Sequence, residues 1–419
     1  MKKKKYVIGF LFLLLFSASA SAQVTLEQCY DSARANYPVI RQFDLLERTE
    51  QFTLENIKRS FLPQLNLSAR ASWQSDVTKL PFEMPGMNIE WMEQDQYQFV
   101  LELKQLVYDG GMVRARREWQ KARTAADRQQ AEVELYALHQ RIDQVYFGIL
   151  LQNAQHKQMQ LLQEQLHQSL EQVQAFLKRG VVCPADVDAV QVELRTVEQS
   201  VRSLETSRKA YCEVLSLFTG MDSLRAEALV TPAVTESGSE ILRPELQLFA
   251  RQKNMLLAQK ETTRAGIRPT LGLFMQGGYG DPGLNMLKGG FSPYYIAGVQ
   301  LSWNIGKLYT LKNERRLIDE QMSQVDIQQS TFLLNTRAEA IQARRNIERI
   351  RDEIQADEDI IRMRGQILES AQARVANGTL SVLEMLRMVL EKEQACQNKA
   401  IHEVELLQAR YALKRIQNN

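Results

Sequence analysis

The chain has 419 residues, 44% of them hydrophobic, with 52 Lys and Arg against 50 Asp and Glu. Without the four lysines among residues 1–22, 48 basic and 50 acidic side chains remain. This balance argues against a nucleic acid as ligand, because proteins that bind phosphate backbones concentrate an excess of basic side chains on one face.

The spacing of the chemically reactive residues indicates neither a metal site nor an active site. The four cysteines lie far apart without C-x-x-C spacing, and the four histidines include no H-x-x-x-H pair. We therefore expect no metal, no cofactor and free cysteines. No nucleophile, base and orienting group occur at a recognised spacing, so the sequence predicts that the protein is not an enzyme.

The first 22 residues have the three parts of a secretory signal. Lys2–Lys5 are basic, Tyr6–Phe16 are apolar, and Ser17–Ala22 are small residues in an A-x-A pattern. We expect residues 1–22 to be a signal peptide that is removed after Ala22. The apolar run is too short to span a bilayer, and no later run reaches about 18 apolar residues, so no transmembrane helix is predicted.

Four segments alternate between apolar and polar side chains, which is the signature of β-strands. They are Leu65–Trp73, Tyr97–Lys104, Leu271–Tyr279 and Tyr295–Ile305. Such strands, apolar on one face and polar on the other, fit a membrane β-barrel with lipid outside and a wet lumen inside. The lipid-facing aromatics would be Trp73, Tyr97, Phe99, Tyr279, Tyr295 and Trp303. A soluble, half-buried sheet is the alternative.

Two windows without proline, 112–179 and 307–377, contain one glycine each and are rich in good helix formers. About 68 helical residues reach roughly 100 Å. Apolar residues within and after these windows recur every three or four positions, which predicts coiled-coil packing. Asp357 and Arg364 interrupt one such seam, where they either set the register or lie exposed on a fraying seam.

The order of elements occurs twice. Gly180 and Gly378, which follow the long helices, are 198 residues apart, and so are Leu103 and Leu301. The predicted organisation is a signal peptide at 1–22, a first repeat at 23–220, a linker at 221–243 and a second repeat at 244–419. The fold class is therefore α+β, with long coiled-coil helices and a four-stranded contribution to a shared barrel.

Four strands cannot close a barrel alone, and unpaired backbone groups in lipid cost several kcal/mol each. Two copies would give eight strands and a lumen filled by side chains, whereas three would give twelve strands and a water-filled passage. We favour three copies, although four are geometrically allowed.

Several local motifs resemble the outer-membrane efflux protein family typified by TolC. They are Thr25–Pro38, Val107–Gly111, Lys178–Gly180, Arg243–Leu246 and Val375–Thr379. The resemblance implies a homotrimer with a twelve-stranded barrel in outer-membrane lipid and a helical tunnel in the periplasm. It also implies docking to a periplasmic adaptor, at turns that contain Gly180, Val181, Gly378 and Thr379, and to an inner-membrane pump of the RND, ABC or MFS type.

In relatives, acidic residues after the second turn line the periplasmic entrance. Glu384 matches the first acidic position, whereas Arg387 replaces the second and Leu380 stands where some relatives have a gating arginine. Asp186 is the equivalent residue of the first repeat, and an Arg387–Asp186 contact is a candidate latch. Alternatively, Glu384 belongs to a capping box with Ser381, and Asp186 interacts with a helix dipole.

The predicted function is the exit duct of a tripartite efflux or type I secretion system, with drug, metal and protein cargo all open. The main alternative is a periplasmic coiled-coil scaffold or adaptor without a membrane barrel. Met84, Met87 and Met92 could bind a soft metal, but they fit ordinary loop residues better.

Overall fold

The computed structural model describes residues 23–78, 92–222, 224–233, 238, 240–286 and 288–418. The predicted signal peptide, Met84 and Met87 lie outside this range. The chain divides into two compact units. The first comprises Met1–Gln42, Ala131–Leu246 and Ser330–Asn419, and the second comprises Phe43–Gln130 and Gln247–Gln329.

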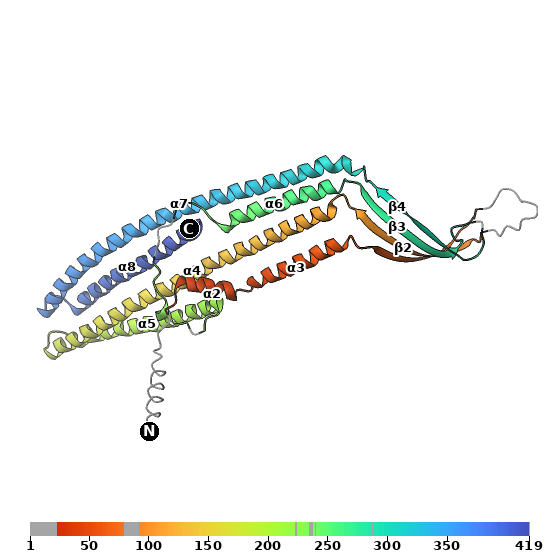
Figure 1. The fold of residues 1–419 in the computed structure, drawn as a ribbon. Coiled ribbons are helices and arrows are strands. Elements are labelled where there is room, and N and C mark those ends of the chain that lie inside the picture. The colour runs from red at the N-terminus through yellow and green to blue at the C-terminus, as the bar shows by residue number, and fades with distance from the viewer. Residues whose placement is uncertain are drawn as a thin grey trace, which may run out of the picture. The chain divides into compact units, whose positions relative to one another are not determined.

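The elements follow the order that the sequence predicts (Figure 1). The first half contains α2 (Leu26–Asn36), α3 (Ile40–Arg59), β1 (Gln64–Trp73), β2 (Asp95–Tyr108), α4 (Met112–Lys178) and α5 (Pro184–Thr219). After η1 (Ala226–Ala228), the second half contains α6 (Pro244–Ala265), β3 (Thr270–Asp281), β4 (Ser292–Ser302), α7 (Lys307–Ala376) and α8 (Val382–Gln417). Within the described residues, no helix is both long and apolar enough to cross a membrane.

The second unit contains one antiparallel sheet with the strand order β1-β2-β3-β4. Ala69 pairs with Phe99, and Phe99 pairs with Tyr279. Side chains directly opposite each other share a face, so the apolar residues of neighbouring strands form one surface. The register of the sheet therefore places the apolar side chains of the predicted alternation on one face and the polar side chains of that alternation on the other.

A small helical core lies in the same unit. Leu256 of α6 is buried against Ile318 and Val325 of α7, with Phe249 and Met322 beside them. Lys260 makes an ion pair with Asp319 at 2.6 Å. These contacts hold α6 along the first part of α7.

The main core of the first unit surrounds Tyr146 and Phe147 of α4, both essentially inaccessible to solvent. Leu26 of α2 and Leu215 of α5 pack against them. The Tyr146 hydroxyl oxygen lies 2.9 Å from the Val24 carbonyl oxygen and 2.7 Å from the Val230 carbonyl oxygen, and its single proton is donated to one of them at a time. The segment between the two repeats is therefore anchored to this core.

A second core in the first unit joins the two helical hairpins. Val187, Val190, Leu194 and Val197 of α5 are buried together with Val382, Met385, Leu386 and Val389 of α8. Leu166 of α4 and Leu368 of α7 belong to the same cluster. Residues at these three- and four-residue spacings form the seams that the heptad pattern predicts.

Candidate functional site at the hairpin tips

The turn between α4 and α5 closes the first helical hairpin. The Gly180 amide donates to the Leu177 carbonyl at 3.0 Å, and the Val181 amide donates to the Phe176 carbonyl at 3.0 Å. This pair of hydrogen bonds is a Schellman motif, which needs a residue in the left-handed region at its end. Gly180 supplies it with φ +73°.

The turn between α7 and α8 has the same geometry 198 residues later. The Gly378 amide donates to Val375 and the Thr379 amide donates to Arg374, both at 2.9 Å, and Gly378 has φ +68°. Apart from the glycine and its chain neighbours, no heavy atom of the described residues lies within 4 Å of where a Cβ of Gly180 or Gly378 would be. The glycines are therefore required by the backbone conformation and not by crowding.

Both helices that leave these turns are capped by the acidic residues predicted for the entrance. The Glu384 amide donates to Ser381 Oγ at 3.1 Å, and the Ser381 amide donates to Glu384 Oε2 at 3.3 Å. The Cys183 amide donates to Asp186 Oδ2 at 2.9 Å. Each carboxylate thus satisfies a backbone amide that has no partner within its helix.

The two turns meet at one pocket of about 380 Å³. Its lining includes Val181 and Asp186 from the first hairpin and Thr379 and Glu384 from the second. The two acids that the sequence places 198 residues apart therefore contribute to the same concave surface. A positively charged group of a partner or a solute would find two carboxylates there.

Arg387 does not contact Asp186 within the protomer. Its Nε lies 3.0 Å from Glu391 Oε1, and Arg364 of α7 pairs with the other oxygen of the same carboxylate. The Arg387 side chain is 80% exposed. Sequence reasoning missed Glu391, although its position four residues after Arg387 is a spacing that favours helical ion pairs.

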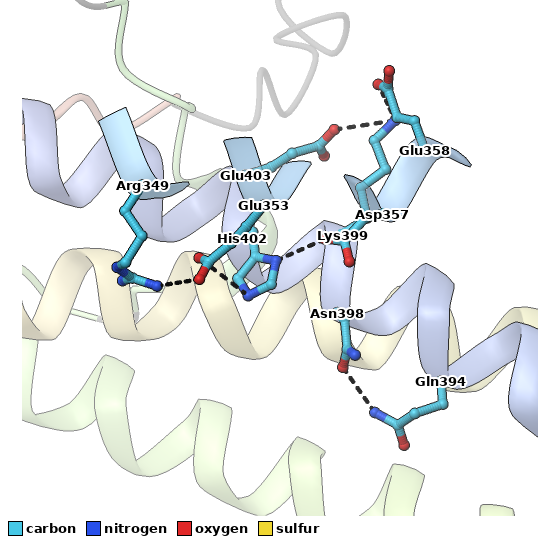
Figure 2. Close-up of polar contacts among 9 residues, drawn as sticks. All are labelled: Arg349, Glu353, Asp357, Glu358, Gln394, Asn398, Lys399, His402 and Glu403. Atoms are coloured by element: carbon cyan, nitrogen blue, oxygen red, sulfur yellow. Dashed lines mark hydrogen bonds and ion pairs between the residues drawn. The ribbon is translucent and has the colours of Figure 1, made fainter. Parts of the chain in front are cut away.

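Charged side chains of α7 around Asp357 are paired with α8 (Figure 2). Asp357 Oδ2 lies 2.7 Å from His402 Nδ1, and Lys399 pairs with Glu358 at 2.9 Å. Asp357 is only 7% exposed. Together with the Arg364–Glu391 ion pair, these contacts fix the register between α7 and α8. They favour the interpretation that Asp357 and Arg364 set the register over the alternative of exposed charges on a fraying seam.

The aromatic residues predicted to face lipid are all exposed in the protomer. Their exposed fractions range from 44% for Tyr97 to 75% for Tyr295, with Trp73, Phe99, Tyr279 and Trp303 between them. Trp303, one residue beyond β4, donates its indole N–H to the Ile267 carbonyl at 2.9 Å. The polar edge of the ring is thus satisfied by a backbone carbonyl, while 54% of the residue remains exposed.

The described part of the chain contains no group of three His, Cys, Asp or Glu side chains that could hold a metal ion. The four cysteines are free, with Cys29 and Cys212 buried, Cys183 exposed and Cys396 half-buried. Burial raises the pKa of the Cys29 thiol to about 12. That thiol is therefore unreactive near neutral pH.

Residues 29–220 match the family model for outer membrane efflux proteins. No curated protein matches the chain in sequence. Among solved structures, the outer-membrane channel OprN is 17% identical with a TM-score of 0.67, over 94% of this chain and 89% of that one. VceC of Vibrio cholerae is 14% identical with a TM-score of 0.66, over 94% and 96%. CmeC of Campylobacter jejuni is 15% identical with a TM-score of 0.62, over 93% and 85%.

The sequence match covers most of the first half, and the structural matches extend the same fold over nearly the whole chain. The matched model describes outer membrane efflux proteins, and OprN and CmeC are outer-membrane channels. Residues 29–220 thus match the outer membrane efflux protein family in sequence, and nearly the whole chain has the fold of the outer-membrane channel OprN and of VceC.

Proposed function

We propose that the protein is the trimeric exit duct of a tripartite efflux or type I secretion system. Three copies would share one twelve-stranded barrel in the outer membrane, and their helices would form a tunnel in the periplasm. Transport through the duct is passive, because the inner-membrane pump, of the RND, ABC or MFS type, supplies the energy.

The observation that carries this proposal is the four-stranded sheet with two unpaired edges. Within the described residues, β1 pairs only with β2 and β4 only with β3. Because the strands alternate in direction, β1 and β4 run antiparallel to each other. The β4 edge of one copy can therefore pair with the β1 edge of the next and continue the antiparallel order, which leaves no open edge in lipid.

Exposed apolar residues on the helices support association of the same copies. Leu334 and Ile341 of α7 are seven residues apart and 68% and 60% exposed. Ile360, Met363 and Ile367 continue along α7 with 41%, 51% and 47% exposed. Residues at this spacing are typical of a seam between helices, so a second copy is their expected partner.

The hairpin tips are the proposed periplasmic end. Gly180, Val181, Gly378 and Thr379 would dock to the adaptor, and Asp186, Glu384 and Arg387 would line the entrance. The proposed organisation is a cleaved signal peptide at 1–22, two repeats at 23–220 and 244–419, and a linker at 221–243. The pocket shared by Asp186 and Glu384 supports a role for both repeats at the entrance.

Three measurements on the full chain test the proposal. Fractionation should place the protein in the outer membrane, light scattering in detergent should give about three times the mass of one chain, and planar bilayers should show discrete conductance steps. A protein extracted without detergent would instead fit the periplasmic scaffold. A measured mass of two or four chains would contradict the trimer and would indicate a barrel of eight or sixteen strands.

A further inference from the structure

Two aromatic side chains on the polar face of the sheet lie over glycines of the neighbouring strand. Tyr294 of β4 is the cross-strand partner of Gly278, and Phe274 of β3 is the cross-strand partner of Gly298. Both rings are half-buried in the protomer. The same arrangement thus occurs twice on β3 and β4: once with the ring on β4 and the glycine on β3, and once with the ring on β3 and the glycine on β4.

Neither glycine could carry a side chain without moving its ring. A Cβ on Gly278 would lie within 2.5 Å of Cε1 and the hydroxyl of Tyr294, and closer still to Cζ. A Cβ on Gly298 would lie 2.9 Å from Cε1 and Cζ of Phe274. The rings therefore occupy the space that a side chain would fill, and they pack against the adjacent strand.

A hydrogen bond holds the tyrosine ring in this position. Gln98 Nε2 of β2 donates to the Tyr294 hydroxyl at 2.6 Å. The Tyr294 side chain consequently reaches from β4 across β3 to β2. Phe274 has no hydroxyl, so no side-chain hydrogen bond can hold its ring over Gly298 in the same way.

The face that carries these rings is the one expected to line the duct. Gln98, Glu102 and Gln276 are on the same face, because Glu102 pairs with Gln276 and even-numbered residues share a side of these strands. The opposite face carries exposed apolar residues such as Leu101 and Met275. A barrel in lipid turns its apolar face outward, so Tyr294 and Phe274 face inward.

We propose that Gly278 and Gly298 set the width of the duct at the level of these two aromatic rings. The inference rests on the proposed channel function. Each glycine lets a ring lie along the wall, where it leaves the lumen open. A methyl group in place of either glycine hydrogen would turn the ring upright, and each copy in the barrel would then narrow the passage at the same height.

Single-channel conductance of the purified full chain in planar bilayers tests this proposal. We expect Gly278→Ala to lower the conductance roughly twofold, since the rings of all copies enter one cross-section of the pore. Gly298→Ala should have a smaller effect, because its Cβ would lie farther from the ring. The matched control is Gly277→Ala, since no heavy atom lies within 4 Å of a Cβ there.

The tyrosine ring itself supplies the second arm of the experiment. Tyr294→Ala alone should leave the conductance nearly unchanged, because the ring packed against Gly278 does not obstruct the lumen. In Gly278→Ala, the additional Tyr294→Ala change should restore the conductance to the level of the unmodified protein. Gly278→Ala could instead fail to assemble. If the added Tyr294→Ala change then restored assembly, this result would equally support a steric conflict between the tyrosine ring and the Cβ at position 278.

The outcomes distinguish this inference from the proposed function. If the unmodified protein produces no conductance steps, the channel proposal fails. If it conducts, and Gly278→Ala behaves like Gly277→Ala, the channel stands and the role of the glycines is wrong. A large rise in conductance with Tyr294→Ala alone would also overturn it, because the ring would then already obstruct the lumen.

Discussion

Glu384 and Asp186 each have two possible roles, as helix caps and as charges at the entrance. Both carboxylates accept backbone amide hydrogen bonds and line the same pocket. An amide side chain can also accept from a backbone amide, and glutamine serves in capping boxes as well as glutamate. The amide variants therefore remove the charge and keep the cap.

We predict that Glu384→Gln with Asp186→Asn lowers the cation preference of the channel without lowering its thermal stability. The physical reason is that rings of acidic side chains favour cations in a narrow pore. Reversal potentials in a salt gradient measure the preference. The double variant Glu384→Ala with Asp186→Ala is the comparison, since it also removes the hydrogen bonds from the Ser381 and Cys183 amides and should cost about 1 kcal/mol per site. An unchanged reversal potential in the amide variant would leave only the capping role.

Glu393 of α8 is an acid in an unfavourable place. It is 8% exposed, and its Oε2 has no hydrogen-bond partner within the described structure. Burial raises the pKa of this carboxyl group above its ordinary value. Below the ordinary pKa, both the folded and the unfolded chain hold the proton. As the pH rises above it, the unfolded chain releases the proton first, and the folded state loses stability until the raised pKa is passed.

We predict that Glu393→Gln stabilises the protein at pH 8 and has little effect near pH 4. The gain should be about 1–3 kcal/mol, the cost of a buried polar group without a partner. Denaturant unfolding in detergent at both pH values measures the difference. Equal stability of the variant and the unmodified protein at pH 8 would mean that Glu393 acquires a partner in the assembly.

The helical hairpins owe their ends to glycines with a specific backbone conformation. Gly378 has φ +68°, and its missing Cβ has no close neighbour. Gly365 lies inside α7 and likewise has no neighbour at its Cβ position. The two glycines therefore differ in backbone conformation and not in available space.

We predict opposite effects of alanine at these two positions. Gly378→Ala should destabilise the protein by about 1–2 kcal/mol, because an L-residue in the left-handed region is strained. Gly365→Ala should stabilise it by about 1 kcal/mol, because alanine is the better helix former. Melting temperatures of the two purified variants provide the measurement. Destabilisation by Gly365→Ala would show that another copy approaches α7 at that point.

Element boundaries could be predicted from the sequence wherever one residue type decides them. The window free of proline at 112–179 became α4 at Met112–Lys178, because nothing within it interrupts a helix. The alternation from Leu65 to Trp73 became β1, because a period of two cannot be accommodated on a helix.

Contacts between distant elements could not be predicted in the same way. The ion pair between Arg364 of α7 and Glu391 of α8 depends on the rotation of α8 against α7. The position of Tyr294 over Gly278 requires the cross-strand register. The burial of Ala226 and Leu229, between the two repeats, has no periodic pattern because the segment is neither a long helix nor a strand.

At the scale of the whole molecule, the two faces of the sheet should respond differently to a charge. Leu67 is on the apolar face and 75% exposed, and it pairs with Leu101. Ser68, the next residue, is on the polar face and pairs with Val100. The two positions are adjacent on β1, and their side chains point to opposite faces of the sheet.

We predict that Leu67→Arg reduces the amount of assembled protein in the outer membrane, whereas Ser68→Arg does not. An arginine on the lipid face of a barrel costs about 2–4 kcal/mol near the middle of the bilayer. Membrane fractionation followed by electrophoresis of unheated samples measures the assembled form. Equal loss in both variants would argue for a soluble sheet in which both faces are packed.

Each copy contributes four strands to the sheet, and this number limits which diameters a barrel built from several copies can have. A barrel assembled from this sheet can grow only by four strands at a time, since every added copy brings β1 to β4 together. Barrel diameter rises with strand number, so the bore has a few widely separated sizes. Smaller changes in pore diameter have to come from substitutions of the residues that face the lumen.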